Sequence, residues 1–160
     1  MAHIHDKIDF TVEVFIVHKN KVLLRMHDKH KIWLSVGGHI ELDEDPVEAA
    51  IREVREEVGI DVEIAGKAYG IDEEKKENRG YKYLIPPRYL GRHPVNENHE
   101  HIVFVYFGKA DTDTVADSVL DHEKGAEIKW ATKEDLLEMN LVPNVLFYAT
   151  KALEELGEQF

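Results

Sequence analysis

The stretch GHIELDEDPVEAAIREVREEVGI, residues 38–60, predicts a loop that leads into a helix over residues 46–58. Asp45 is a suitable N-cap, Glu48 completes a capping box with it, and Gly59 is placed to end the helix in the left-handed conformation. A stripe roughly 60° wide on this helix holds its apolar side chains, which are Val47, Ile51, Val54 and Val58. The helix is therefore expected to pack its apolar stripe against a core.

A second face of the same helix is acidic, because Glu53, Glu56 and Glu57 form one contiguous arc. Glu53 and Glu57 are one turn apart, where like charges repel by a few tenths of a kcal/mol. A divalent cation reverses the sign of that interaction, and Mg²⁺ prefers carboxylate oxygens together with substrate phosphates. A solvated amphipathic helix is the competing interpretation for a glutamate-rich helix taken alone.

The whole stretch resembles the Nudix box, the signature of the Nudix hydrolase family. The residues that match its fixed positions are Gly38, Glu44, Arg52, Glu53, Val54, Glu56, Glu57, Gly59 and Ile60. The resemblance implies an α/β (α+β) fold, in which a mixed sheet is sandwiched between helices, as a single domain over residues 1–160. Ser35-Val36 replaces the Leu-Pro found in many relatives, which weakens an assignment to the MutT-like group that acts on oxidised nucleotides.

Enzymes of this family cleave the diphosphate of a nucleoside diphosphate linked to another group, by attack of water on phosphorus with Mg²⁺ or Mn²⁺. The resemblance implies four metal-binding residues, which are Glu53, Glu56, Glu57 and the carbonyl group of Gly38. It implies that Arg52 takes part in catalysis by orienting a glutamate. It also implies that Glu44 orients the loop or takes part in metal binding through a water molecule. The sequence thus predicts a nucleotide pyrophosphatase.

The general base stays open, because a family member uses either a glutamate of the box or a carboxylate from another loop. Glu100, just before a predicted strand, is the first candidate outside the box and Glu97 is the second. Three nearby histidines allow a transition-metal site, phosphate contacts or simple packing, and these are His93, His99 and His101.

Residues 78–95 contain bases and tyrosines but no Asp or Glu, which is unusual in a chain with a net charge of −12. Such a stretch is suited to a phosphorylated ligand with a ring that stacks. A tyrosine-rich hairpin that packs on the sheet would show the same composition. The predicted substrate-binding residues are Arg25, His39, Arg79, Tyr83 and Arg88.

The acidic charge argues against DNA or a general polyanion as partner, and the substrate is expected to be a small nucleotide. The chain has no cysteine, which excludes disulfides, thiolate sites and the cysteine-dependent isopentenyl diphosphate isomerase that shares the fold. We find no apolar run of membrane-spanning length and expect a cytoplasmic protein; a homodimer stays open. A noncatalytic nucleotide-sensing domain and an RNA-decapping hydrolase compete with the pyrophosphatase interpretation.

Apolar patterns predict the remaining elements. Strands are expected at residues 9–17, 22–26, 33–34, 61–70, 81–85, 102–107 and 127–130. The first of these alternates as a strand with one buried face, and helices are expected at residues 133–139 and 143–156. A charged turn is expected at residues 73–80, and loops at residues 88–100 and 110–124.

Overall fold

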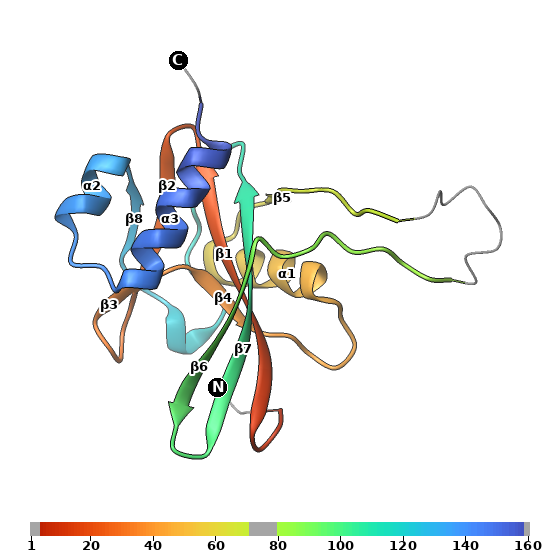
Figure 1. Ribbon diagram of the computed structural model, residues 1–160. Coiled ribbons are helices and arrows are strands. Elements are labelled where there is room, and N and C mark those ends of the chain that lie inside the picture. Colours follow the sequence, from red (N-terminus) through yellow and green to blue (C-terminus); the bar gives the residue numbers. More distant parts are fainter. Residues whose placement is uncertain (1–3, 71–79, 159–160) are drawn as a thin grey trace.

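The computed structural model describes residues 4–70 and 80–158, in which helices cover both faces of an eight-stranded mixed sheet (Figure 1). The strands are β1 (Ile8–His18), β2 (Lys21–His27), β3 (Ile32–Leu34), β4 (Val36–His39), β5 (Glu63–Ile64), β6 (Tyr89–Asn96), β7 (His99–Lys109) and β8 (Ile128–Ala131). The helices are α1 (Pro46–Val58), α2 (Lys133–Glu138) and α3 (Pro143–Leu156), with a 3₁₀ turn η1 (Asp121–Glu123). This arrangement confirms the predicted fold class.

Strand β1 is the centre of the sheet, because it pairs in parallel with β7 and antiparallel with β2 and β4. Val12, Val14 and Ile16 face the core under α1, whereas Phe15 and Val17 belong to a second core under α3. The prediction of one buried face was wrong, because helices cover both sides of this strand. A central strand of this kind is apolar on both faces along most of its length.

Helix α1 has the bounds and the ends that its sequence predicts. The Asp45 carboxylate accepts the backbone N–H groups of Val47 and Glu48, and the Glu48 side chain completes the capping box. Gly59 ends the helix with φ of 65°, a conformation that glycine adopts without strain. These local interactions determine where the helix begins and ends, and therefore on which face its acidic residues lie.

Three predictions between residues 61 and 100 were wrong. The strand at 61–70 is reduced to the two residues of β5, residues 81–85 form no strand, and the expected loop at 88–100 contains β6. Strand β6 pairs antiparallel with β7, and most of its side chains are exposed. Since it lacks a buried face, it carries no alternation of apolar and polar residues for sequence reasoning to detect.

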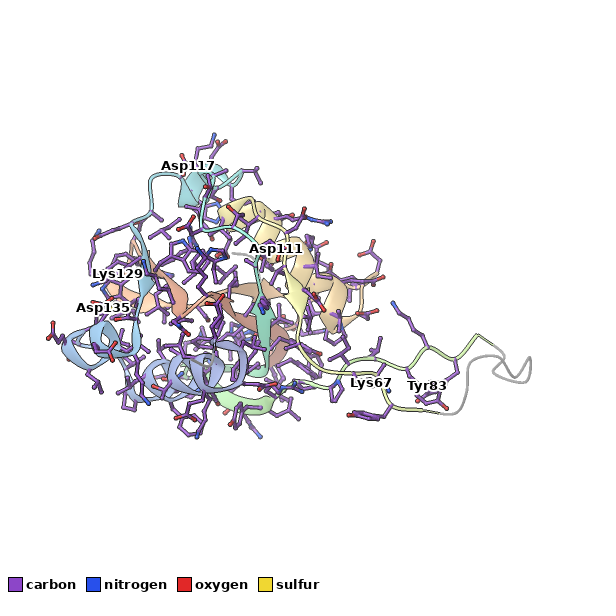
Figure 2. All side chains as sticks on the ribbon, turned by 90° about the horizontal axis from the view of Figure 1, so that it is seen from above. Lys67, Tyr83, Asp111, Asp117, Lys129 and Asp135 are labelled. Atoms are coloured by element: carbon purple, nitrogen blue, oxygen red, sulfur yellow. The ribbon has the colours of Figure 1, made fainter. Side chains whose placement is uncertain are left out.

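Residues 65–70 and 80–88 form an arm that projects from the body of the molecule (Figures 1 and 2). Lys67 and Tyr83 are both on this arm in Figure 2, away from the helices. The charged turn predicted at 73–80 lies, apart from Gly80, outside the described residues. Within the described parts of the chain, no helix combines the length and the apolar character that crossing a bilayer requires.

Candidate active site

Two of the three helix glutamates are buried, since Glu53 is 3% exposed and Glu57 is 4% exposed. Burial raises the pKa of Glu53 to about 7, although Arg52 pulls in the opposite direction. Burial likewise raises the pKa of Glu57 to about 9, against the attraction of Arg25. Low-dielectric surroundings disfavour an ionised carboxylate unless a cation offsets its charge. The pair therefore forms a site in which added positive charge would be stabilising.

Arg52 connects the acidic residues to the loop that precedes the helix. It binds Glu44 side-on, with Nε 2.9 Å from Oε2 and Nη2 2.6 Å from Oε1. Its Nη1 donates to Glu53 at 2.9 Å and to Glu56 at 3.0 Å, while Nη2 also donates to the carbonyl of His39. Although burial opposes the change, hydrogen bonds from Arg52 lower the pKa of Glu44. A planar guanidinium with five donors is suited to hold several oxygens in one geometry.

Gly38 leaves the space that the Glu53 carboxylate occupies. A Cβ atom at position 38 would lie 2.3 Å from Oε1 and 2.5 Å from Cδ of Glu53, so no other residue fits without moving that carboxylate. Oε2 of Glu53 is buried and has no hydrogen-bond partner within the described chain. A buried carboxylate oxygen without a donor is a suitable ligand atom for a cation.

Arg25 reaches the same cluster from β2. Its Nη1 donates to Oε2 of Glu57 at 2.7 Å, and its guanidinium also contacts Glu123 through the carboxylate and the backbone carbonyl. Glu123, in η1, contributes to the raised pKa of both Glu53 and Glu57. Arg25 thus contacts two acidic side chains and also lines the cleft described next, and its predicted role in substrate binding stays a prediction.

A cleft of about 550 Å³ opens beside this cluster, and its wall includes Arg25, Gly38 and Glu123. Six of the ten histidines of the chain line it, which are His27, His30, His39, His93, His101 and His122. Lys29 adds a further base. The volume is in the usual range for a small-molecule site, and the lining offers donors for an anionic ligand.

Tyr83 and Arg88 do not line this cleft, and their role as substrate-binding residues stays a prediction. Tyr83 packs edge to face on Tyr81 within the arm, and Nε of Arg88 donates to Glu155 of α3 at 2.8 Å. The other predicted base of that stretch, Arg79, lies outside the described residues.

The bases of that stretch lack acidic neighbours in sequence because their partners come from elsewhere in the fold. Lys82 binds Asp45 at the start of α1, and Arg92 binds Glu100 of β7. Glu100 is thus engaged by a base and does not line the cleft, while Glu97 is exposed in the turn between β6 and β7. Neither residue is brought to the helix glutamates by any contact in the described chain.

Three acidic residues that line the cleft were missed in the sequence, which are Glu13, Asp28 and Glu123. Glu123 lay in a stretch expected to be an acidic loop, and Glu13 lies in β1 between Val12 and Val14, which both pack in the core under α1. Burial raises the pKa of Glu13, with His93 acting in the opposite direction. A glutamate within a run of buried strand residues was the one available signal for Glu13, whereas Glu123 had none.

Comparison with known proteins agrees with this arrangement. The NUDIX domain model matches residues 9–150. A crystal structure of a NUDIX-family hydrolase from Clostridium perfringens is 41% identical, covers 92% of this chain and 97% of its own, and superposes with a TM-score of 0.79.

More distant structures share the fold. The MutT NUDIX hydrolase of Burkholderia pseudomallei is 19% identical over 94% of this chain and 99% of its own, with a TM-score of 0.62. The MutT protein of Methanosarcina mazei Go1 is 21% identical over 95% and 97%, with a TM-score of 0.61. No curated protein gives a significant match. The extent of the domain match and the 41% identity show that the chain belongs to the NUDIX family and is a hydrolase of that family.

Proposed function

We propose that the protein is a metal-dependent nucleotide pyrophosphatase, which hydrolyses the diphosphate of a nucleoside diphosphate linked to another group. The family acts on small nucleotides and uses divalent metals. The observation that carries the proposal is the convergence of Glu53, Glu57 and Glu123 beside one cleft, with two of these carboxylates buried. Such a cluster is unfavourable by itself and becomes favourable when a cation is bound.

The residues present fit Mg²⁺ or Mn²⁺ by the chemistry of their donors. Glu53, Glu56 and Glu57 supply hard carboxylate oxygens, and Gly38 leaves room for the Glu53 carboxylate beside its own backbone. When bound, the metal supplies charge neutralisation for phosphoryl oxygens and makes water a better nucleophile. Arg52 holds Glu44, Glu53 and Glu56 in place, so it acts by positioning ligands and does not need to touch the substrate.

The reaction requires a base, because a water oxygen forms a bond to phosphorus while the bond to the leaving phosphate oxygen breaks. One proton of the water must then be accepted. We propose Glu123 for this role in place of Glu100. Glu123 lines the cleft, and its negative charge helps to raise the pKa of both Glu53 and Glu57. Its side chain is 20% exposed, which leaves it accessible from the cleft.

Two matched variants test the assignment of the base. Glu123→Gln is expected to lower kcat by about 10²–10⁴-fold at saturating metal, the usual range for loss of a general base. Glu100→Gln is expected to stay within a few-fold of wild type, because its carboxylate is bound to Arg92 outside the cleft. A wild-type rate in Glu123→Gln would remove this residue from the mechanism.

A substrate panel with Mg²⁺ tests the function itself. It contains canonical and oxidised deoxynucleoside triphosphates, ADP-ribose, nucleotide sugars and dinucleoside polyphosphates, and the phosphorus products identify the bond that is cleaved. Glu57→Gln is expected to lose several orders of magnitude in rate, whereas Glu134→Gln, a change of an exposed acid on α2, is expected to lose none. Binding of a nucleotide without turnover of any substrate would favour a noncatalytic sensing function.

A further inference from the structure

One aspartate and two histidines form a second cluster at the wall of the cleft, apart from the helix glutamates. Asp9 of β1, His39 of β4 and His101 of β7 each direct one ligand atom into it, and these atoms all lie within 4.8 Å of one another. Asp9 is fully buried and His39 is 8% exposed, while His39 and His101 line the cleft. Two nitrogens and one oxygen therefore converge beside the cleft.

The sheet brings the three residues together. The parallel pairing of β1 with β7 sets Asp9 beside His101, and the antiparallel pairing of β1 with β4 sets His39 beside Thr11. Thr11 and Asp9 are two residues apart on one strand, so their side chains point to the same face. A constellation built on paired strands is held more rigidly than one built on loops.

Two backbone N–H groups orient the Asp9 carboxylate. The backbone N–H groups of His5 and Ile4 donate to the two oxygens of Asp9, at 2.7 Å and 3.1 Å. The Asp9 carboxylate is thus held in a defined orientation.

A fourth residue, His99, is 4% exposed and faces the same carboxylate. Its Nδ1 lies 3.1 Å from the carbonyl oxygen of Asp6, which only accepts, so Nδ1 carries the proton of that bond. Its Nε2 then points at Oδ2 of Asp9, at 3.3 Å. Carbonyl-bound imidazoles and oriented carboxylates are the usual outer support of protein metal sites.

The spacing of the nitrogens around Oδ2 of Asp9 suits a cation. Besides Nε2 of His99, the Nε2 of His39 lies 3.1 Å from this oxygen. A proton or a metal ion between an imidazole nitrogen and a carboxylate oxygen makes a contact at such distances favourable. Zn²⁺ bonds to nitrogen and oxygen at about 2.0–2.1 Å, which places tetrahedral ligand atoms roughly 3.4 Å apart. The His39–Asp9 pair already has about this spacing, and no pair has to close by more than about 1.4 Å.

We propose that Asp9, His39 and His101 form a second cation site, which takes a borderline transition metal of the Zn²⁺ type and leaves one coordination position open to the cleft. Two imidazoles and one carboxylate are suited to Zn²⁺ and unsuited to Mg²⁺, which prefers oxygen ligands. The open position would bind a donor group of a ligand in the cleft. This site does not depend on the proposed pyrophosphatase reaction, since its residues are separate from the helix glutamates.

Metal titration of the full chain tests the site without any substrate. Metal-free protein is placed in excess Mg²⁺ to saturate oxygen-ligand sites, and Zn²⁺ binding is then measured by calorimetry. Co²⁺ is titrated in parallel, because its visible absorption reports four-coordinate nitrogen and oxygen ligation. We expect one Zn²⁺ per chain and a Co²⁺ spectrum of the four-coordinate type.

His101→Gln is expected to weaken Zn²⁺ binding by at least about tenfold and to abolish the Co²⁺ spectrum. His30→Gln is the matched control, because His30 lines the same cleft but stacks on His27 away from the cluster, and it is expected to bind Zn²⁺ as wild type does. If His101→Gln fails to fold, His39→Gln is titrated in its place. Absence of Zn²⁺ binding in the wild type would overturn the proposal, as would an equal loss in His30→Gln or a loss confined to Glu57→Gln.

Discussion

Alanine substitutions at Gly37 and Gly38 distinguish a change in the metal-binding site from a change in the stability of the sheet. At Gly38, a Cβ would lie 2.3 Å from Oε1 of Glu53, so this carboxylate has to withdraw by about 1 Å to reach an ordinary contact. At Gly37, a Cβ would lie 2.1 Å from the backbone oxygen of Val12 in the central strand. One substitution therefore displaces the end of a side chain, whereas the other pushes two paired strands apart.

The magnitudes follow from these contacts. In Gly38→Ala, the buried carboxylate moves and weakens its 2.9 Å bond to Arg52, an overpacking change that costs about 1–3 kcal/mol. For a domain of this size, that lowers Tm by roughly 2–12 °C. Gly37→Ala is expected to cost more, because the backbone pairing of β4 with β1 has to yield.

Thermal melts with and without Mn²⁺ measure both effects. At a Mn²⁺ concentration of about 100 Kd, wild type gains about 2.7 kcal/mol of stability. A hundredfold weaker site in Gly38→Ala would reduce that gain to about 0.4 kcal/mol at the same concentration. The reasoning fails if Gly38→Ala keeps the full stabilisation by Mn²⁺, or if Gly37→Ala melts no lower than Gly38→Ala.

Three further predictions concern Arg52, Glu57 and Asp45. Arg52→Lys is expected to weaken Mn²⁺ binding by about 10–100-fold, because an ammonium cannot make the paired bonds to Glu44; unchanged calorimetric affinity would contradict this. In metal-free protein, the raised pKa of Glu57 means that the folded state holds a proton which the unfolded state releases above about 4.5, so the free energy of unfolding falls as pH rises from there toward 9. Urea unfolding in EDTA should show a flatter pH dependence for Glu57→Gln than for wild type, and equal slopes would refute the assignment. Asp45→Ala removes the helix cap and should lower the free energy of unfolding by about 1–2 kcal/mol, whereas Asp61→Ala, an exposed control, should change it by less than about 0.5 kcal/mol.

Local chemistry alone determined the central helix. Its cap, its apolar stripe and its terminal glycine all act within a few residues, so the range 46–58 and both ends could be predicted from the sequence. The acidic face of α1 follows from the same helix, whereas the resemblance of residues 38–60 to the Nudix box indicated the reaction class. Strands with apolar patterns, such as β7, were also found, because burial on the sheet dictates their residues.

Contacts between segments that are distant in sequence determined the features that the sequence analysis missed. Strand β6 is held by backbone pairing with β7 and not by a buried face, so its sequence resembles a loop. Residues 78–95 lack acids because Lys82 and Arg88 find theirs on the two helices α1 and α3, which made an ion-paired surface resemble a phosphate site. Long-range pairing leaves no trace in the spacing of residues along the chain.

In the cleft, too, some features could be predicted from the sequence and others depend on the tertiary structure. Sequence alone identified the acidic face of α1, but only the fold placed Glu123 opposite it and Arg25 between the two. Strand register likewise brought Asp9, His39 and His101 together from three segments. A motif encodes side chains that share one helix, whereas a site that spans several strands exists only after the sheet has formed.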